Sequence, residues 1–265
     1  MTAAINSETS APGGHIALVG GTGFEQLPPD IFAEPVEVET RFGVVRILSV
    51  ANNYVEPYKL YFLSRHGAAH GLPPHRIDYR ANTAALLELG VRYVLATNAV
   101  GSLRADLPVG AFVLLDDFID FTRGRPLTFF DTDANWQHVD FTLPYSPFLR
   151  QTIKEAAHRL GISLVERGTY LCCDGPRFET PAEVRLFAHW GADVVGMTGI
   201  PEVVFAREAG MEYASLAIVT NYGAGVTEET VDHTAVVALM EAILPAVQEL
   251  LFVTAGKIIE KVQTN

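Results

Sequence analysis

The stretch IALVGGTGFEQ, residues 16–26, is the clearest sign of the fold, because an apolar strand runs directly into a glycine-rich turn. A dinucleotide-binding turn requires the pattern G-x-G-x-x-G, in which the third glycine lets strand and helix pack closely. Here Gly23 is followed by FEQ, so the third glycine is missing. The turn still offers backbone N–H groups and the Thr22 hydroxyl, which suit one small anion better than a pyrophosphate. On the turn alone, an anion site and an ordinary strand-ending turn are equally good interpretations.

The rest of the chain alternates short apolar runs with helical patterns. Runs rich in apolar and β-branched residues predict strands at 15–20, 43–50, 59–64, 92–98, 111–117, 169–173, 192–197 and 213–220. Apolar spacing and glycine ends predict helices over 79–90, 146–161, 180–191 and 201–210, and a long amphipathic helix from about 230 to 261. This alternation predicts an α/β fold with one continuous sheet, in a single domain over residues 15–265. The small, polar residues 1–14 are expected to be a disordered tail, without a signal-peptide pattern.

Composition argues against several classes of partner. The net charge is −12, so nucleic acids and anionic membrane surfaces are poor partners. No run of about 18 uninterrupted apolar residues is present, so a transmembrane helix is not expected. The two cysteines, Cys172 and Cys173, are adjacent in an apolar run, and we expect buried thiols in a cytoplasmic protein.

Several predicted strands end in groups that suit an anion. Arg65 and His66 end one strand, where Gly67 is expected to leave both side chains exposed at the sheet edge. Arginine offers planar, bidentate donation to an oxyanion, and histidine adds a second donor. Thr198 ends a later strand and supplies a hydroxyl. With Thr22, these residues predict an anion pocket at the carboxyl ends of the strands. A metal site is not expected, because no carboxylate or thiol completes a metal-ligand set with the nearby histidines.

Other strand ends predict an apolar slot with polar groups in it, formed by Phe178, Glu179, Met197 and Asn221. Phe178 could stack on a flat ring, while Glu179 could accept hydrogen bonds from ring N–H groups. Glu179 is equally typical of a helix start, where a negative charge favours the dipole. Asn221 could simply be a turn residue before Gly223. Asn98 and Ala99 follow another apolar strand and offer further polar groups to a ligand. An anion held beside a flat heterocycle suggests that the anion is a co-substrate.

Residues 121–147 form the least regular stretch, rich in phenylalanine and containing a tryptophan. A long aromatic loop in a compact domain is usually functional. We therefore expect a lid or a contact between subunits in this stretch.

Taken together, the motifs GGTGF, RHG, PPHRIDYRAN, NAVGSLR, GPRFET, WGADVVGMTGIPEVVFAREAG and YASLAIVTNY resemble the purine nucleoside and methylthioadenosine phosphorylase family over nearly the whole chain. The resemblance implies an α/β fold around a mixed, partly barrel-like sheet flanked by helices. It also implies a homotrimer that uses inorganic phosphate as co-substrate and needs no metal or organic cofactor. In this family the glycine loop holds phosphate, which decides the question raised by residues 16–26.

The resemblance also implies roles for individual residues. The phosphate-binding residues would be Thr22, Arg65, His66, Asn98, Ala99 and Thr198. The residues that contact the nucleoside would be Phe178, Glu179, Met197, Asn221, Gly223 and His233, with Phe141 reaching the site of a neighbouring subunit. Of these, Asn221, His66 and Glu179 are the expected catalytic residues.

The base-reading residues depart from the adenosine-type pattern. Methylthioadenosine phosphorylases resemble TDYD where this chain has TNYG, and they have a small residue in place of Glu179. Asn221 can donate to a 6-oxo group and accept from a protonated 7-nitrogen, whereas an aspartate only accepts. Glu179 would accept from the 1-nitrogen N–H that adenine lacks. The sequence therefore predicts phosphorolysis of 6-oxopurine nucleosides such as inosine, guanosine or methylthioinosine. His233 would favour a 5′-hydroxyl over a 5′-methylthio group.

Three alternatives remain open at this stage. The first is a methylthioadenosine phosphorylase that releases adenine. The second is a phosphatase, because the Arg-His-Gly triplet also occurs in histidine phosphatases, although there it follows the first strand. The third is a purine-binding protein without catalytic activity.

Overall fold

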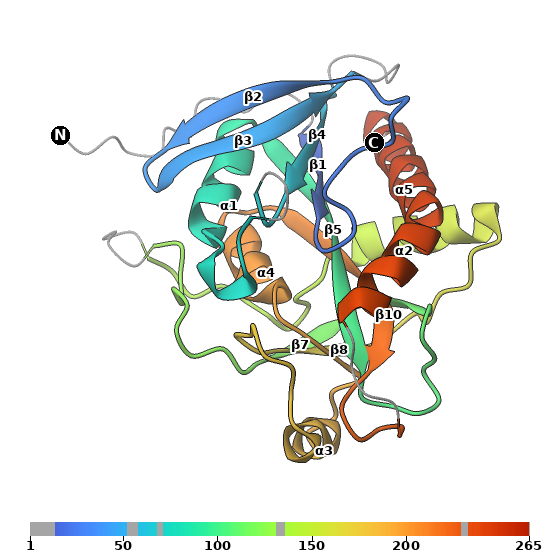
Figure 1. The fold of residues 1–265 in the computed structure, drawn as a ribbon. Helices are drawn as coiled ribbons and strands as arrows, with labels where there is room; N and C mark the ends of the chain where they lie inside the picture. Colours follow the sequence, from blue (N-terminus) through green and yellow to red (C-terminus); the bar gives the residue numbers. More distant parts are fainter. Residues whose placement is uncertain (1–13, 52–57, 68–70, 131–135, 229–232, 265) are drawn as a thin grey trace.

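The computed structural model describes residues 14–51, 58–67, 71–130, 136–228 and 233–264, which form a single α/β domain (Figure 1). In this part of the chain a mixed sheet of ten strands is flanked by five α-helices. The strands are β1 (His15–Gly20), β2 (Ala33–Thr40), β3 (Gly43–Val50), β4 (Leu60–Ser64), β5 (Val91–Ser102), β6 (Phe112–Leu114), β7 (Asp117–Asp120), β8 (Thr169–Cys172), β9 (Val194–Gly196) and β10 (Glu212–Tyr222). The helices are α1 (Tyr79–Glu88), α2 (Pro147–Leu160), α3 (Pro181–His189), α4 (Gly199–Glu208) and α5 (His233–Gln263), with a short 3-10 helix, η2 (Pro74–Arg76).

Strand β5 lies at the centre of the sheet. The main strand order is β2-β3-β4-β1-β5-β9-β8-β7, and β10 pairs with both β5 and β6. Strands β4, β1, β5 and β10 run parallel to one another, so their carboxyl ends meet at one edge. Strand β9 joins that edge antiparallel, opposite Gly101 and Ser102 at the end of β5. The predicted mixed α/β sheet is confirmed, and its topology gathers the strand ends that carry the polar motifs.

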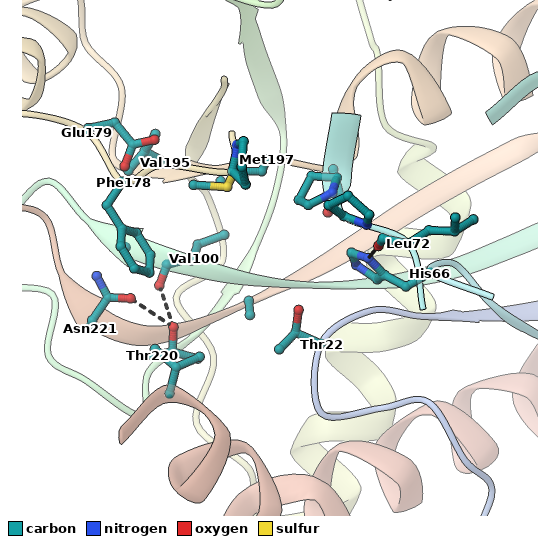
Figure 2. A pocket seen from close by; sticks show the side chains of 18 of the residues that line it. Thr22, His66, Leu72, Val100, Phe178, Glu179, Val195, Met197, Thr220 and Asn221 are labelled. Carbon is teal, nitrogen blue, oxygen red and sulfur yellow. Dashed lines mark hydrogen bonds between the residues drawn. The ribbon is translucent and has the colours of Figure 1, made fainter. Parts of the chain in front are cut away.

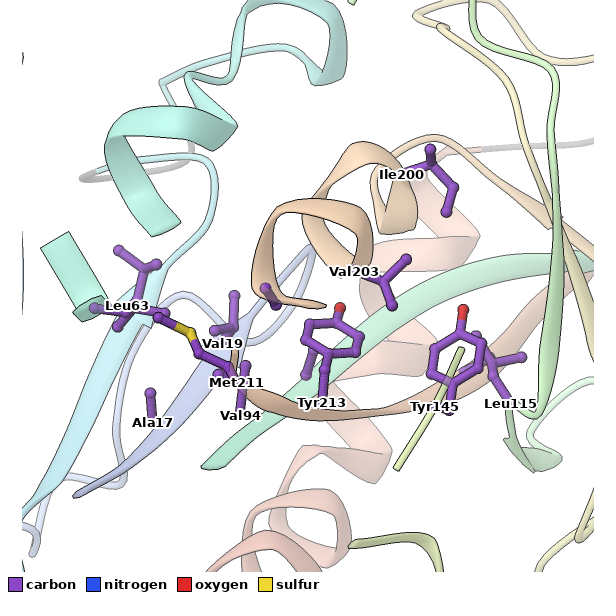
Figure 3. Close-up of a cluster of buried hydrophobic side chains, with 14 of the residues drawn as sticks. Ala17, Val19, Leu63, Val94, Leu115, Tyr145, Ile200, Val203, Met211 and Tyr213 are labelled. Atoms are coloured by element: carbon purple, nitrogen blue, oxygen red, sulfur yellow. The ribbon is translucent and has the colours of Figure 1, made fainter. Parts of the chain in front are cut away.

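Alternation along the strands builds a core on each face of the sheet. In β1, Ala17 and Val19 pack with one cluster, whereas Ile16 and Leu18 pack with the other. The first cluster includes side chains of α1 and α4, and Figure 3 shows its strand residues beside Val203 of α4. The second cluster includes side chains of α2 and α5. Period-two burial therefore sandwiches the sheet between two helix layers.

Helix α5 is the longest helix described, and by length and composition its segment Val236–Gln263 could cross a membrane. One side of it packs into the domain, where Val247, Leu250, Leu251 and Ala255 are fully buried. Figure 1 shows α5 lying beside α2 along the sheet. Because 33% of its most apolar 18-residue stretch is buried in the domain, packing against the sheet accounts for part of its apolar character.

Most predicted elements are present, with shifted boundaries. Strands β2 and β7 were not predicted. The helix expected to begin at Pro201 begins at Gly199, with non-helical backbone at Ile200 and Pro201. The expected tail falls almost entirely on residues 1–13, outside the described residues, as does the predicted start of the last helix near residue 230.

Candidate active site

The ends of β1, β4, β5, β9 and β10 surround a cavity of about 510 Å³ (Figure 2). This volume is in the range of pockets that enclose small organic ligands. Figure 2 shows Phe178, Glu179 and Asn221 gathered at one end of the cavity, with Thr22 and His66 toward the other. The predicted site residues in its wall are Thr22, His66, Ala99, Phe178, Glu179, Met197, Thr198 and Asn221. The sequence-predicted anion and ring subsites therefore share one cavity.

Glu179 gives the ring end of the cavity a buried acceptor. Its Oε1 atom is buried and has no hydrogen-bond partner among the described residues. Burial raises the pKa of the Glu179 carboxyl, and a hydrogen bond with the Cys173 thiol offsets part of that rise. An unpaired buried acceptor is costly, and this one belongs to a residue that lines the cavity, where a ligand can satisfy it. Glu179 is thus poised to accept a hydrogen bond from a ligand N–H.

The amide of Asn221 is held in one orientation by its neighbours. Its Nδ2 donates to the main-chain carbonyl of Tyr222 at 2.9 Å. Its Oδ1 lies 3.1 Å from the Thr220 hydroxyl, whose single proton is shared with the Val100 carbonyl at 3.2 Å. A main-chain carbonyl can only accept, so the NH₂ group must lie on the Tyr222 side. One N–H and one lone pair of the amide remain for a ligand. Asn221 can therefore donate and accept at the same time.

The Arg65 side chain beneath the glycine loop after β1 leaves little room for side chains in that loop. A side chain at position 21 would meet Arg65 Nη1 at 2.6 Å, so only glycine fits there. Gly23 has a φ of +79°, and its N–H donates to the Glu25 carboxylate at 2.9 Å. The Gly23 N–H is therefore occupied and is not among the backbone groups that the loop offers to an anion. The Thr22 side chain is the part of the loop that lines the cavity.

Arg65 is buried, contrary to the expected exposure at the sheet edge; it is 1% exposed. Its Nε and Nη2 donate to the Glu202 carboxylate at 2.7 and 2.8 Å, and Nη1 donates to the Thr97 carbonyl at 2.8 Å. Glu202 also accepts from the Tyr213 hydroxyl at 2.7 Å. Arg65 therefore lies behind the glycine loop as one half of a buried ion pair.

His66 keeps its predicted place in the cavity wall, although it too is buried rather than exposed. Its Nδ1 lies 2.8 Å from the main-chain carbonyl of Leu72 (Figure 2). Because that carbonyl only accepts, Nδ1 must carry a proton. The hydrogen bond thereby fixes both the tautomer of the neutral ring and its orientation.

Asn98 supports the anion end from behind the wall. Its Nδ2 pairs with Thr198 Oγ1 at 2.8 Å, and its Oδ1 pairs with Ser215 Oγ at 2.6 Å. All three side chains are buried or nearly so. Asn98 therefore contacts Thr198, whose hydroxyl lies at the cavity, and ties it to β10.

Tyr170 caps the start of α4. Its hydroxyl accepts from the N–H groups of Thr198 and Gly199, both at 3.1 Å. Burial raises the pKa of Tyr170 well above its ordinary value, so the hydroxyl stays neutral. The N–H group of Thr198 is therefore occupied, which leaves its side chain to meet a ligand.

Comparison with known proteins shows which family the chain belongs to. The sequence profile of the phosphorylase superfamily matches residues 15–254. The chain belongs to this family. The resemblance predicted from the motifs is thereby confirmed.

Several relatives of this phosphorylase have names that state a nucleoside substrate. The 6-oxopurine nucleoside phosphorylase of Pyrococcus furiosus is 47% identical over 232 residues, covering 85% of this chain and 86% of that protein. A probable S-methyl-5'-thioinosine phosphorylase of Methanopyrus kandleri is 45% identical over 237 residues, covering 89% of this chain and 90% of that protein. Methylthioadenosine phosphorylase from Schistosoma mansoni, solved in complex with adenine, has a TM-score of 0.83 at 31% identity, with 95% of this chain and 96% of that chain covered.

Besides Arg65 and Asn98, three more predicted site residues are not among the residues that line the cavity. Gly223 lies behind the wall, where its N–H donates to the Ser102 carbonyl at 2.7 Å. Phe141 packs edge-on against Phe118 of its own chain, with ring centroids 5.9 Å apart. His233 begins α5, but its side chain lies outside the described residues.

Sequence reasoning missed several residues that shape the site. Glu202, Tyr170 and Thr220 were not singled out, although each holds a cavity residue or the arginine beneath the loop. Glu202 had a detectable signal, because it is a lone acidic residue within the apolar segment GIPEVVFA. Among the described residues, no group of three or more histidine, cysteine or acidic side chains could hold a metal ion.

Proposed function

We propose that this nucleoside phosphorylase cleaves 6-oxopurine nucleosides with inorganic phosphate, releasing the purine and a ribose 1-phosphate. Nucleosides with a 5′-hydroxyl or a 5′-methylthio group are both included. The observation that carries the proposal is the buried, unpartnered Oε1 of Glu179 in the same cavity as the oriented amide of Asn221. Adenine has a lone pair at the 1-nitrogen, whereas a 6-oxopurine has the N–H that Glu179 needs.

Base recognition follows from these two side chains. Glu179 accepts the 1-nitrogen N–H, and the free N–H of Asn221 donates to the 6-oxo group. As the glycosidic bond breaks, its electrons move into the purine and the 7-nitrogen takes a proton. The remaining lone pair of Asn221 Oδ1 accepts that new N–H, so the contact strengthens in the transition state. Phe178 packs against the ring from one side.

The phosphate end supplies the nucleophile. Thr22, His66 and Thr198 hold phosphate beneath the anomeric carbon, and the Arg65–Glu202 pair keeps the loop and strand behind them rigid. A phosphate oxygen bonds to the anomeric carbon as the bond to the purine breaks, and the proton of hydrogen phosphate balances the one gained by the base. Positioning and charge complementarity to the developing oxocarbenium ion supply the rate enhancement. No further cofactor takes part in this scheme.

The choice between 6-oxopurine and adenine rests on the base-reading residues rather than on overall similarity. The two sequence relatives described above, at 47% and 45% identity, are named a 6-oxopurine nucleoside phosphorylase and a probable methylthioinosine phosphorylase, whereas the Schistosoma mansoni structure at 31% identity is a methylthioadenosine phosphorylase. Both groups share the fold, so the fold alone does not decide the base. Val236, which lines the cavity, is an apolar contact that leaves a methylthio substrate open.

The direct experiment compares inosine, guanosine, methylthioinosine and methylthioadenosine with and without phosphate. We expect phosphate-dependent release of hypoxanthine or guanine, with methylthioadenosine the poorest substrate. Base release that persists without phosphate would indicate a hydrolase. Methylthioadenosine as the best substrate would assign the enzyme to the adenine-releasing class. Binding of purines without turnover would favour a non-catalytic role, and phosphate release from monoesters a phosphatase.

We also propose that the active assembly is a homotrimer in the cytoplasm. The loop over residues 121–147 leaves Leu127, Trp136 and Leu143 between 59% and 79% exposed, which suits contact with another subunit. Phe141 lies in the same loop, and the proposal places it at a neighbouring site. Sedimentation of the active enzyme as a monomer would contradict this assembly.

A further inference from the structure

Arg125, in the irregular segment after β7, reaches into the centre of the domain. Only 4% of its side chain is exposed. One amino group, Nη2, donates to the main-chain carbonyls of Met197 at 2.6 Å, Asp174 at 3.1 Å and Cys173 at 3.3 Å. The other, Nη1, donates to the carbonyl of Ile200. One guanidinium therefore collects four carbonyls from segments far apart in the sequence.

These carbonyls belong to the segments that carry the cavity walls. Cys173 and Asp174 lead into the turn that presents Phe178 and Glu179 to the ring end. Met197 itself lines the cavity, and the adjacent Thr198 lies at the anion end. The carbonyl of Ile200 belongs to the first turn of α4. A single side chain thus holds backbone from both the ring end and the anion end of the site without lining the cavity.

Chemistry favours arginine over lysine at this position. A guanidinium has five N–H donors in one plane, whereas an ammonium has three donors around a point. Beyond the carbonyls, Nη1 also donates to the Tyr79 hydroxyl at 3.3 Å. Nε lies at an ion-pair distance of 3.3 Å from the Asp174 carboxylate but makes no hydrogen bond among the described residues. Without these donors the carbonyls would be buried acceptors lacking their partner, and the strand ends would have to rearrange.

We propose that Arg125 is a positioning residue that fixes the base-reading turn and the β9–α4 junction relative to each other. The inference rests on the proposed function, because it assigns Arg125 to the alignment of purine and phosphate. Arg125 touches neither ligand. Its loss therefore separates the two subsites, so that the purine and the nucleophile no longer line up. A displacement of about 1 Å is enough to cost about 100-fold in rate.

The experiment compares Arg125→Lys and Arg125→Ala with Arg150→Lys as a matched control. Arg150, on α2, also donates to a main-chain carbonyl, that of Glu166 at 2.7 Å, but lies away from the cavity. Steady-state kinetics give kcat and the KM of nucleoside and phosphate separately. The melting temperature is measured alone, with hypoxanthine and with phosphate. Low-millimolar guanidinium, with methylammonium as its control, tests chemical rescue of Arg125→Ala.

We expect both Arg125 variants to lose about 100-fold in kcat/KM, with kcat lowered and the KM values of both substrates raised. Guanidinium should restore part of the activity of Arg125→Ala, methylammonium should not, and Arg150→Lys should stay near wild type. Hypoxanthine and phosphate should also raise the melting temperature of the variants less than that of wild type. Folded Arg125 variants with wild-type kcat and KM values would overturn the inference. Activity that falls only with the folded fraction, without rescue, would also overturn it. Inactive wild-type enzyme would instead refute the proposed function, and the ligand-induced melting shifts would still test Arg125.

Discussion

Replacing Glu179 is the sharpest way to examine base recognition. In Glu179→Ala the 1-nitrogen N–H of a 6-oxopurine loses its acceptor. In Glu179→Gln a neutral amide can still accept that N–H, or turn its NH₂ toward the bare 1-nitrogen of adenine. Alanine should therefore reduce 6-oxopurine cleavage most. Glutamine should shift the preference toward adenine nucleosides most.

The size of the effect follows from the burial of the carboxylate. Oε1 is buried and unpartnered, so the ligand N–H would form a hydrogen bond to a charged group largely shielded from water. Such a bond contributes about 1.5–3 kcal/mol. At about 1.4 kcal/mol per factor of ten, Glu179→Ala should lower kcat/KM for inosine or methylthioinosine about 10- to 150-fold. A neutral acceptor is roughly half as strong, so Glu179→Gln should lose less.

The assay measures initial rates of base release by chromatography at saturating phosphate, for methylthioinosine and methylthioadenosine in parallel. These substrates share the sugar, so the ratio of their kcat/KM values isolates the base. Glu183→Gln is the matched control, because it removes a carboxylate four residues away that pairs with Arg177. If neither Glu179 variant changes the ratio by more than about threefold, Glu179 does not read the purine and the argument from its buried oxygen fails.

The raised pKa of Glu179 adds a pH signature to the same residue. Burial lifts its folded-state pKa above the ordinary value of 4.5, so the ionised form is destabilised in the folded protein. Folding stability is therefore reduced as pH rises through the folded-state pKa, and Glu179→Gln should melt higher than wild type at neutral pH. Turnover of 6-oxopurines should fall on acidification through that raised pKa, and the acid limb attributable to this group should vanish in the variant.

Three further perturbations probe the rest of the site. Glu202→Gln leaves Arg65 buried without its counter-charge and should destabilise the fold by about 3–5 kcal/mol, measured by denaturant unfolding; an unchanged unfolding free energy would show that the pair does not stabilise the fold. Asn98→Ala removes the support of Thr198 and should raise the KM for phosphate about tenfold with little change in the nucleoside KM; an equal rise in both would argue against a phosphate-side role. Asn221→Asp places a carboxylate oxygen against the main-chain carbonyl of Tyr222 and should lower kcat/KM for 6-oxopurine nucleosides about 10- to 100-fold. Any rise in kcat/KM for methylthioadenosine should be smaller than this loss, and unimpaired inosine turnover would show that the amide is not needed.

The fold was predictable where local pattern and burial agree. The apolar runs of β1, β5 and β10 are buried on both faces, so each stands out as a continuous strand. β2 was overlooked, although PVEVET alternates valine with polar residues as an exposed edge strand should. β7, with only four residues, is too short to show a period.

The site was predictable as a set of strand ends but not as a network. Thr22, His66, Glu179 and Asn221 each follow an apolar run or precede a helix, so sequence position alone marks them. The partners that orient the site come from remote segments. Arg65 meets Glu202 across 137 positions, a pairing that only the closed sheet creates. Local sequence carries no information about such contacts, and the expected exposure of Arg65 failed for that reason.

The charge arrangement explains how a strongly acidic protein can hold an anionic co-substrate. The chain carries a net charge of −12, so long-range attraction does not bring phosphate to it. Within the site, the positive charge of Arg65 is matched by Glu202 at 2.7 Å. The polar groups at the anion end are therefore mainly hydroxyls, together with an imidazole held in a fixed orientation by the Leu72 carbonyl, and a neutral ion pair lies behind them. Under the proposed function, such a set would select phosphate by geometry and bind it without a large net charge. That suits a reaction in which phosphate must leave as part of the sugar product.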